Sequence, residues 1–363
     1  MRMGISMVLA LAMILFGAEL FTNAVEWFGR KLGLGQGAVG SVLAALGTAL
    51  PETAVPVTAI VLGGGSSAAQ EVWIGGILGA PFLLVTLGSL VMATALLLST
   101  RVRNGVYLDV HPRSFHRDMV FFLLAYAVTL LVGSIQSDLV HRWAPWVLVA
   151  LYCLFVVFTV RDKDAIVTET HLKPLYMQRR DGPPTLGAVL LQLLFALVLI
   201  VGGAQLLSVG VEHLAGILNW PPFVLSVLLI PLATELPETL NSVVWIRQGK
   251  DALALGNITG AMVFQSTLVP ALGIWLTPWR LTPEALFTGS LTLAAASLIF
   301  GVFRLRGRMS PGVLMAASLL YWVLPLQTLA VHYEIEGLYW IGPVIGLLVL
   351  VLLMRTGRQT RSA

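Results

Sequence analysis

The sequence predicts an all-α polytopic membrane protein of two inverted five-helix repeats and one extra C-terminal transmembrane helix. Composition, the placement of basic residues and an internal repeat support this prediction. Of the 363 residues, 57% are hydrophobic and 11% are charged, whereas soluble domains carry about 25% charged residues. The mean hydropathy is +0.88. The single cysteine, Cys153, excludes an intrachain disulfide framework and a cysteine-rich metal site.

Eleven apolar segments approach the length of about 20 residues that a helix needs to cross a bilayer. They fall at residues 5–28, 37–62, 71–99, 118–136, 143–160, 186–213, 222–246, 252–276, 284–303, 311–331 and 338–354. We therefore expect about 11 spans.

The basic residues predict how these spans are oriented. If the N-terminus lies outside and the spans alternate, 19 of the 22 lysines and arginines fall on the inside, and the exceptions are Arg2, Arg142 and Arg280. Basic residues concentrate in the inner loops of membrane proteins. This distribution predicts an N-out, C-in protein, and we expect it in the plasma or inner membrane.

The first half of the chain recurs in the second half after a shift of 186 residues. Gly17, Ala18, Leu20, Val25 and Glu26 fall on Gly203, Ala204, Leu206, Val211 and Glu212. Without a gap, Thr48, Leu50, Pro51, Glu52 and Thr53 fall on Thr234, Leu236, Pro237, Glu238 and Thr239. After a five-residue loop difference, GGILGAPFLL (75–84) aligns with GNITGAMVFQ (256–265).

This repeat predicts the domain organisation. Residues 1–160 form the first repeat, 161–185 a cytoplasmic linker, 186–334 the second repeat, and 335–363 the extra helix with a basic cytoplasmic tail. Each repeat holds five spans, so the second repeat enters the membrane with the opposite orientation. Inverted repeats with interrupted helices are typical of secondary transporters, which bind their ions between the repeats.

The proline of each LPET motif interrupts the hydrogen bonding of its helix. Proline has no N–H and clashes with the carbonyl four residues earlier, so Pro51 frees the carbonyl of Gly47 and Pro237 frees that of Ala233. A free carbonyl inside a bilayer must find another partner or line a cavity. Both carbonyls are therefore candidate ligands.

Each motif adds a hydroxyl and a carboxylate, from Thr48 and Glu52 in the first repeat and from Thr234 and Glu238 in the second. A charged residue inside a span is costly and usually functional. Two such motifs that face each other could supply the about six to eight oxygens that Ca²⁺ prefers. The sequence thus predicts a cation site at the membrane midplane.

Glu235 adds a third carboxylate three residues before Glu238, on nearly the same helix face. The three carboxylates cannot all stay ionised in a low-dielectric cavity unless cations or protons neutralise them. No lysine or arginine lies near the centre of a span to do so. Competition between two cations for the same carboxylates is the physical basis of antiport. Asn257 and Gln265 offer neutral oxygens from the second repeat only.

These motifs resemble those of the calcium/cation antiporter superfamily, the sodium/calcium exchanger-like proteins. That family carries G-T-S-x-P-E and A-T-S-x-P-E motifs in its second and seventh helices, where this chain has GTALPET and ATELPET. It carries G-N-x-x-G-S-N-type segments in its third and eighth helices, where this chain has GGILGAP and GNITGAM. The resemblance covers about 5–100 and 186–276, and implies that Glu52 and Glu238 are the central cation ligands, with Thr48 and Thr234 beside them.

The chain departs from the family pattern at several ligand positions. Serine is replaced by Ala49 and Glu235, and acidic or amide residues are replaced by Leu84 and Gln265. The Ser-Asn pairs become Ala80–Pro81 and Ala261–Met262. The third helix of the first repeat has therefore lost its polar ligands. We expect Glu235 to restore the lost negative charge at a new place, and the resemblance implies a divergent member.

The leading functional prediction is an antiporter that exchanges Ca²⁺ or a related cation for Na⁺ or H⁺ by alternating access. The alternatives are a proton-coupled antiporter for a different cation, or a channel or ion-sensing membrane protein without exchange. An intramembrane enzyme is disfavoured because the sequence has no convincing nucleophile–base pair and no histidine deep within a span. We expect no cofactor besides the transported cation. The expected partners are inorganic cations and the lipid bilayer, and not nucleic acid.

Overall fold

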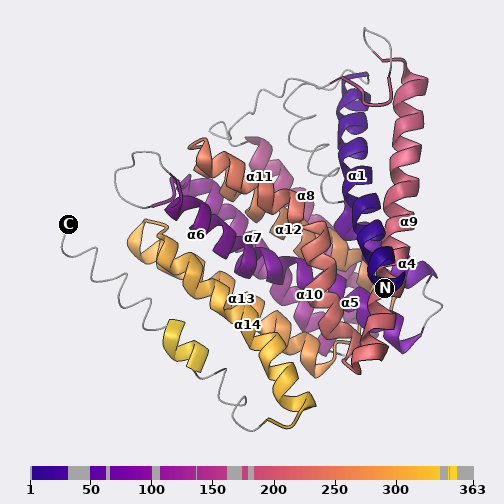
Figure 1. Cartoon of the computed structure of the whole chain (residues 1–363). Helices are drawn as coiled ribbons and strands as arrows, with labels where there is room; N and C mark the ends of the chain where they lie inside the picture. Colours follow the sequence, from indigo (N-terminus) through magenta and orange to yellow (C-terminus); the bar gives the residue numbers. More distant parts are fainter. Residues whose placement is uncertain are drawn as a thin grey trace.

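The computed structural model describes residues 2–31, 50–62, 66–99, 107–135, 137–161, 174–178, 184–335, 342 and 344–349. Within these ranges the chain is helical, and Leu108 pairs with Met309 in an isolated β-bridge. The helices in chain order are α1 (Arg2–Lys31), α4 (Leu50–Leu62), α5 (Ser67–Leu83), the π-helical η2 (Leu84–Gly88), α6 (Ser89–Leu97), α7 (Pro112–Ser134), α8 (Asp138–Arg161), α9 (Leu186–Leu218), α10 (Pro222–Thr234), α11 (Leu236–Arg247), α12 (Asp251–Leu276), α13 (Pro283–Arg306) and α14 (Pro311–His332), and Figure 1 shows their arrangement.

The long apolar helices confirm a multi-pass membrane protein. In the described part of the chain, eight helices are long and apolar enough to cross a membrane, and α10 with α11 forms a bent ninth candidate. These nine candidates coincide with nine of the eleven expected segments. The expected span at 37–62 is described only from residue 50, and that at 338–354 lies mostly outside the described residues.

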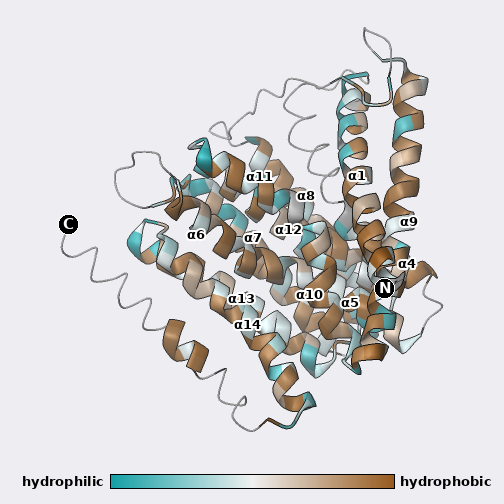
Figure 2. Ribbon diagram, in the orientation of Figure 1, coloured by the Kyte–Doolittle hydropathy of each residue, from teal (hydrophilic) through white to brown (hydrophobic). Residues whose placement is uncertain are grey.

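The helices divide into a central and a peripheral set. In the most apolar stretch of each span, the share of buried residues is 72% for the span Ser67–Leu97 and 61% for α12, but only 28% for α1 and for α9. Both peripheral helices expose large hydrophobic side chains, such as Phe16 of α1 and Leu194 of α9, and Figure 2 shows mostly hydrophobic residues along α9. Such exposed apolar surface fits lipid, because a lipid-facing helix does not need a polar side.

Small residues let the two peripheral helices α1 and α9 pack closely side by side (Figure 1). A Cβ atom on Gly17 would lie 2.8 Å from Cγ1 of Ile200, and one on Gly203 would lie 2.9 Å from the carbonyl oxygen of Ala10. Small residues at such crossings are typical of helix pairs in membranes, where close backbone approach maximises van der Waals contact.

A second close crossing joins α5 to α10. A Cβ atom on Gly79 would lie 2.8 Å from Cγ of Pro231 and 2.9 Å from Cα and the carbonyl oxygen of Val227. At the start of α10, the backbone N–H of Phe223 donates to Oε2 of Glu71 at 3.2 Å. Gly79 therefore permits the close approach of α5 to α10. Beyond Gly79 the helical path continues through η2 into α6.

The central spans pack in a reciprocal pattern. Helix α12 packs on α7 and α8, whereas α5, η2 and α6 pack on α13 and α14. A hydroxyl group reinforces the first of these contacts, because Thr129 on α7 donates to the carbonyl of Ser266 on α12 at 3.2 Å. Within the first half, Tyr126 on α7 donates to the carbonyl of Leu78 on α5 at 3.2 Å. Each expected third helix thus rests on the fourth and fifth helices of the other half.

We predict that Gly79→Ala destabilises the protein by about 1–3 kcal/mol, because the added methyl group overpacks the crossing with α10. The matched control is Gly301→Ala in α13, where a Cβ atom would have no described heavy atom within 4 Å. Thermal unfolding in detergent measures both. Equal melting temperatures for the two variants would contradict the packing argument.

Candidate functional site

The site begins with a break in the helical path at Glu235. Helix α10 ends at Thr234, Glu235 has φ −85° and ψ −2°, and the two helical segments on either side of the break differ in direction by 49°. Pro237 follows at once, and because it has no N–H it leaves the carbonyl of Ala233 without its helical donor. The interruption predicted for the second LPET motif therefore occurs.

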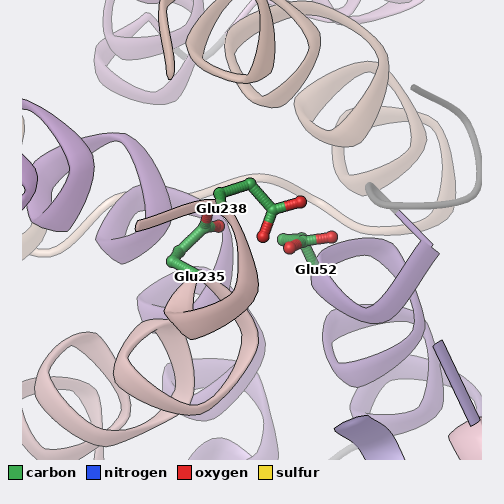
Figure 3. A group of neighbouring side chains, drawn as sticks. All are labelled: Glu52, Glu235 and Glu238. Atoms are coloured by element: carbon green, nitrogen blue, oxygen red, sulfur yellow. The ribbon is translucent and has the colours of Figure 1, made fainter. Parts of the chain in front are cut away.

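Three glutamates meet at this break. One carboxylate oxygen each from Glu52, Glu235 and Glu238 lies within 4.8 Å of the other two. The three residues are 4%, 0% and 3% exposed. Figure 3 shows Glu52 on one helix and Glu238 on another pointing toward each other, with Glu235 beside them. Residues 186 positions apart in the sequence are therefore neighbours in space.

Hydrogen bonding leaves much of this carboxylate cluster unsatisfied. Gln265 on α12 donates from Nε2 to Oε1 of Glu235 at 2.6 Å. Both carboxylate oxygens of Glu52, Oε2 of Glu235 and the side-chain oxygen of Gln265 have no hydrogen-bond partner among the described residues. Buried charges are normally paired, bound to a metal or neutralised, so the arrangement suits a cation.

Helix ends add to the electrostatics of the cluster. Glu238 lies in the first turn of α11, and Glu52 lies in the first turn of the described part of α4. Helix N-termini stabilise negative charge, and helix C-termini, such as the end of α10 before Glu235, stabilise positive charge. At the break, the C-terminus of α10 and the N-terminus of α11 therefore both adjoin the carboxylate cluster.

Two hydroxyl residues shape the backbone of the site and were missed in the sequence analysis. Thr239 donates to the carbonyl of Glu235 at 2.5 Å, and Ser242 donates to the carbonyl of Glu238 at 2.9 Å. The signal that could have found them is their spacing, since a hydroxyl four residues after a carbonyl in a helix commonly donates back to it.

Of the other predicted ligands, two lie in α10, one lies in α12 and two lie outside the described residues. Thr234 and Ala233 are buried in the last turn of α10, and the Thr234 hydroxyl donates to the carbonyl of Ile230 at 3.3 Å. Asn257 is half-buried on α12, eight residues before Gln265 and so about 12 Å away along the helix axis. Gly47 and Thr48 lie outside the described residues.

The apolar residues of the two third helices that depart from the motif pattern lie in the central spans. Ala80, Pro81 and Leu84 are buried, as is Met262, while Ala261 is half-buried. Two hydroxyls near Leu84 in the span Ser67–Leu97 bond within their own helix: Thr86 donates to the carbonyl of Phe82, and Ser89 to that of Val85. These groups therefore satisfy the backbone of the π-helical turn.

Comparison with known proteins identifies similar sequences. The family model described as sodium/calcium exchanger protein matches residues 4–161 and 188–329. The inner membrane protein YrbG of Escherichia coli (strain K12) is 23% identical over 348 residues, which cover 93% of this chain and 97% of YrbG. The putative antiporter CaxA of Alkalimonas amylolytica is 24% identical over 302 residues, which cover 83% of this chain and 89% of CaxA.

Solved structures share the fold. The crystal structure of the H⁺/Ca²⁺ exchanger CAX superposes with a TM-score of 0.68 at 18% identity, covering 98% of this chain and 88% of CAX. The sodium-calcium exchanger NCX_Mj superposes with a TM-score of 0.54 at 17% identity, covering 89% of this chain and 97% of NCX_Mj. Because the family model matches most of the sequence, the chain belongs to the sodium/calcium exchanger protein family.

Proposed function

We propose that this protein is a secondary active antiporter that exchanges Ca²⁺ or a related cation for Na⁺ or H⁺ by alternating access. The observation that carries the proposal is the buried cluster of Glu52, Glu235 and Glu238 at a helix break. Membership of the exchanger family supports the same reaction class. A channel, the second candidate, needs no buried set of three carboxylates that holds its ion.

The donor set suits a hard divalent cation. Ca²⁺ takes about six to eight oxygen ligands at about 2.3–2.6 Å. In our proposal Glu52 and Glu238 hold the ion from opposite sides, Glu235 and the Gln265 oxygen complete one wall, and the carbonyl of Ala233 and the hydroxyl of Thr234 lie behind them. Gly47, Thr48 and Asn257 remain proposed ligands from the sequence pattern.

Apolar residues at positions where the motif pattern has polar ligands favour H⁺ as the coupling ion. Sodium needs several oxygen ligands, whereas a proton needs only one carboxylate. The residues that replace the polar ligands of the pattern are Ala80, Pro81, Leu84, Ala261 and Met262. With these positions apolar, we propose that protons compete with the transported cation for the three carboxylates.

We further propose that the two halves are inverted repeats, with the N-terminus outside and the C-terminus inside a plasma or inner membrane. The reciprocal packing of α12 on α7 and α8, and of the α5–α6 span on α13 and α14, supports a pseudo-twofold relation. The two matched segments of the family model support a division near the predicted linker, 161–185. An ion site between such repeats can open alternately to the two sides.

The direct test of exchange is ⁴⁵Ca²⁺ uptake into proteoliposomes under an outward H⁺ gradient, an outward Na⁺ gradient, or neither. We expect uptake above that of protein-free liposomes only with a counter-gradient, and the largest uptake with H⁺. Equal uptake in all three conditions would indicate a channel and contradict antiport. Uptake driven by Na⁺ alone would retain antiport and overturn the choice of H⁺.

We predict that Glu52→Gln and Glu238→Gln each reduce gradient-driven uptake to the level of protein-free liposomes, because each removes a central charge from the site. The matched control is Glu284→Gln, which neutralises an exposed glutamate at the start of α13 and should transport normally. Size-exclusion chromatography checks that each variant remains folded. Wild-type uptake by both site variants would remove the basis of the proposed site.

For Glu235→Gln we predict that the half-saturating Ca²⁺ concentration rises about ten-fold or more. At an effective dielectric constant of about 20, a unit charge at about 4 Å contributes about 4 kcal/mol before desolvation is subtracted. Uptake is measured against Ca²⁺ concentration at two pH values. A changed pH profile with unchanged half-saturation would make Glu235 a proton carrier only and contradict its role as a cation ligand.

A further inference from the structure

A polar triplet recurs at the same place in the two peripheral helices. After the shift of 186 residues, the triplet of α1 falls on that of α9, and the residues are Glu19, Thr22 and Glu26 in α1 and Gln205, Ser208 and Glu212 in α9. The spacing of three and then four positions places each triplet on one face of its helix. Polar and charged residues are costly in membrane-spanning helices and usually have a function there. A polar face that occurs in both helices therefore needs a functional explanation.

The two triplets run toward opposite ends of the helix pair. Each begins two residues after a glycine of the crossing, Gly17 in α1 or Gly203 in α9, and continues toward the C-terminus of its helix. A Cβ atom on Gly203 would lie 2.9 Å from the carbonyl oxygen of Ala10. Further along α9, one on Gly210 would lie 2.8 Å from Cγ of Met7, which precedes Ala10, so the helices are antiparallel. The α1 triplet and the α9 triplet therefore extend from the crossing in opposite directions.

The α9 triplet extends from the depth of the carboxylate cluster toward the end of α9. Helices α9 and α10 pack on each other, and residues 219–221 join the end of α9 at Leu218 to the start of α10 at Pro222. Each helical residue adds about 1.5 Å, so Gln205 on α9 and Glu235 after α10 both lie about 20 Å from this turn. Glu212 lies about 9 Å from it.

The central residue of the α9 triplet faces the helices of the cluster. Ser208 lies on the same helix face as Ala204 and Val211, which belong to the main hydrophobic core. Helix α9 packs on α4, which carries Glu52, and on α10, which ends directly before Glu235. The polar triplet therefore adjoins the helices that build the proposed cation site.

Two members of the α9 triplet have polar atoms without a protein partner. Ser208 is 2% exposed, and its Oγ and the buried Oε1 of Gln205 have no hydrogen-bond partner among the described residues. By contrast, the equally buried hydroxyl of Ser89 donates to the carbonyl of Val85. Buried polar groups without a protein partner are unusual and call for a water, an ion or a functional role. These two oxygens are therefore available to solvate a passing ion.

We propose that the α9 triplet lines the route by which the transported cation passes between the carboxylate cluster and the membrane face at which α9 ends. The α1 triplet lines the corresponding route toward the opposite face. Glu212 attracts the hydrated divalent cation near the entrance, and Ser208 and Gln205 replace part of its water shell at the depth of the cluster. The inference rests on the proposed antiport and names residues through which the ion reaches its site.

The first test separates the route from the binding site. We expect Glu212→Gln to lower the initial rate of gradient-driven ⁴⁵Ca²⁺ uptake at least about three-fold at low Ca²⁺ concentration, because the charge that attracts the cation is lost. Equilibrium ⁴⁵Ca²⁺ binding in detergent at about 0.15 M salt should change less than about two-fold, because a charge beyond about 8 Å is largely screened. The matched control, Glu284→Gln, should change neither. An unchanged uptake rate, or binding weakened beyond this limit, would overturn the route.

The second test measures water access to the α9 triplet in proteoliposomes. Ser208→Cys and its matched control Val209→Cys are each combined with Cys153→Ser and treated with a small cationic methanethiosulfonate on both sides of the membrane. Val209 is the next residue of α9 and is 50% exposed on the outer surface of the helix. We expect Ser208→Cys to react at least about ten-fold faster, because the reactive thiolate does not form in apolar surroundings. Equal rates, or a faster reaction of Val209→Cys, would overturn the route.

The attached label then tests passage of the ion. It places a positive charge beside the proposed route, so we expect ⁴⁵Ca²⁺ uptake by labelled Ser208→Cys to fall at least about ten-fold. Uptake should recover when a reducing agent removes the label, which shows that the protein remained folded. Undiminished uptake by the fully labelled protein would place Ser208 outside the path of the ion.

Failure of the route can be distinguished from failure of the antiport. Absence of gradient-driven uptake in the wild-type protein would overturn the proposed function and the route with it. Normal uptake by the wild-type protein, by Glu212→Gln and by labelled Ser208→Cys would leave antiport intact and overturn the route alone.

Discussion

Burial of three carboxylates within 4.8 Å of one another is the constraint on which the rest of this structure depends. Like charges at this distance in a low-dielectric interior repel strongly, and each has lost its hydration. A bound cation or a proton can offset both costs, and removal of that positive charge must be followed by its replacement. The same electrostatic requirement that makes the cluster a binding site therefore makes it a site of exchange.

The helices place this cluster where it can work. The bend between α10 and α11 presents a carbonyl end and an amide end of a helix to the same place, and Gln265 fixes Glu235 from α12. The close crossings at Gly79 and Gly203 leave little freedom between the packed helices. Rigid helices around a broken one allow movement to concentrate at the break.

Much of the site could be predicted from the sequence, because the determining patterns are local. Proline followed by glutamate in an apolar span indicates an interrupted helix, and the shift of 186 residues predicts that Glu52 and Glu238 form a pair. The bond from Gln265 to Glu235 could not be predicted, because it depends on how α12 is rotated against α10. The hydrogen bonds of Asn23 on α1 and Gln192 on α9 with the backbone of residues 174–178 could not be predicted either, because they form only when distant parts of the chain pack together. The span number and orientation stay predictions.

The most direct measurement is a crystal structure of the protein soaked with Sr²⁺, a Ca²⁺ analogue located by its anomalous scattering. The account predicts an anomalous peak between Glu52 and Glu238, coordinated by their carboxylate oxygens at distances slightly longer than the about 2.3–2.6 Å of Ca²⁺, and its loss in Glu238→Gln. Sr²⁺ bound elsewhere in the membrane region, with the three carboxylates in contact only with protein groups, would contradict the central claim.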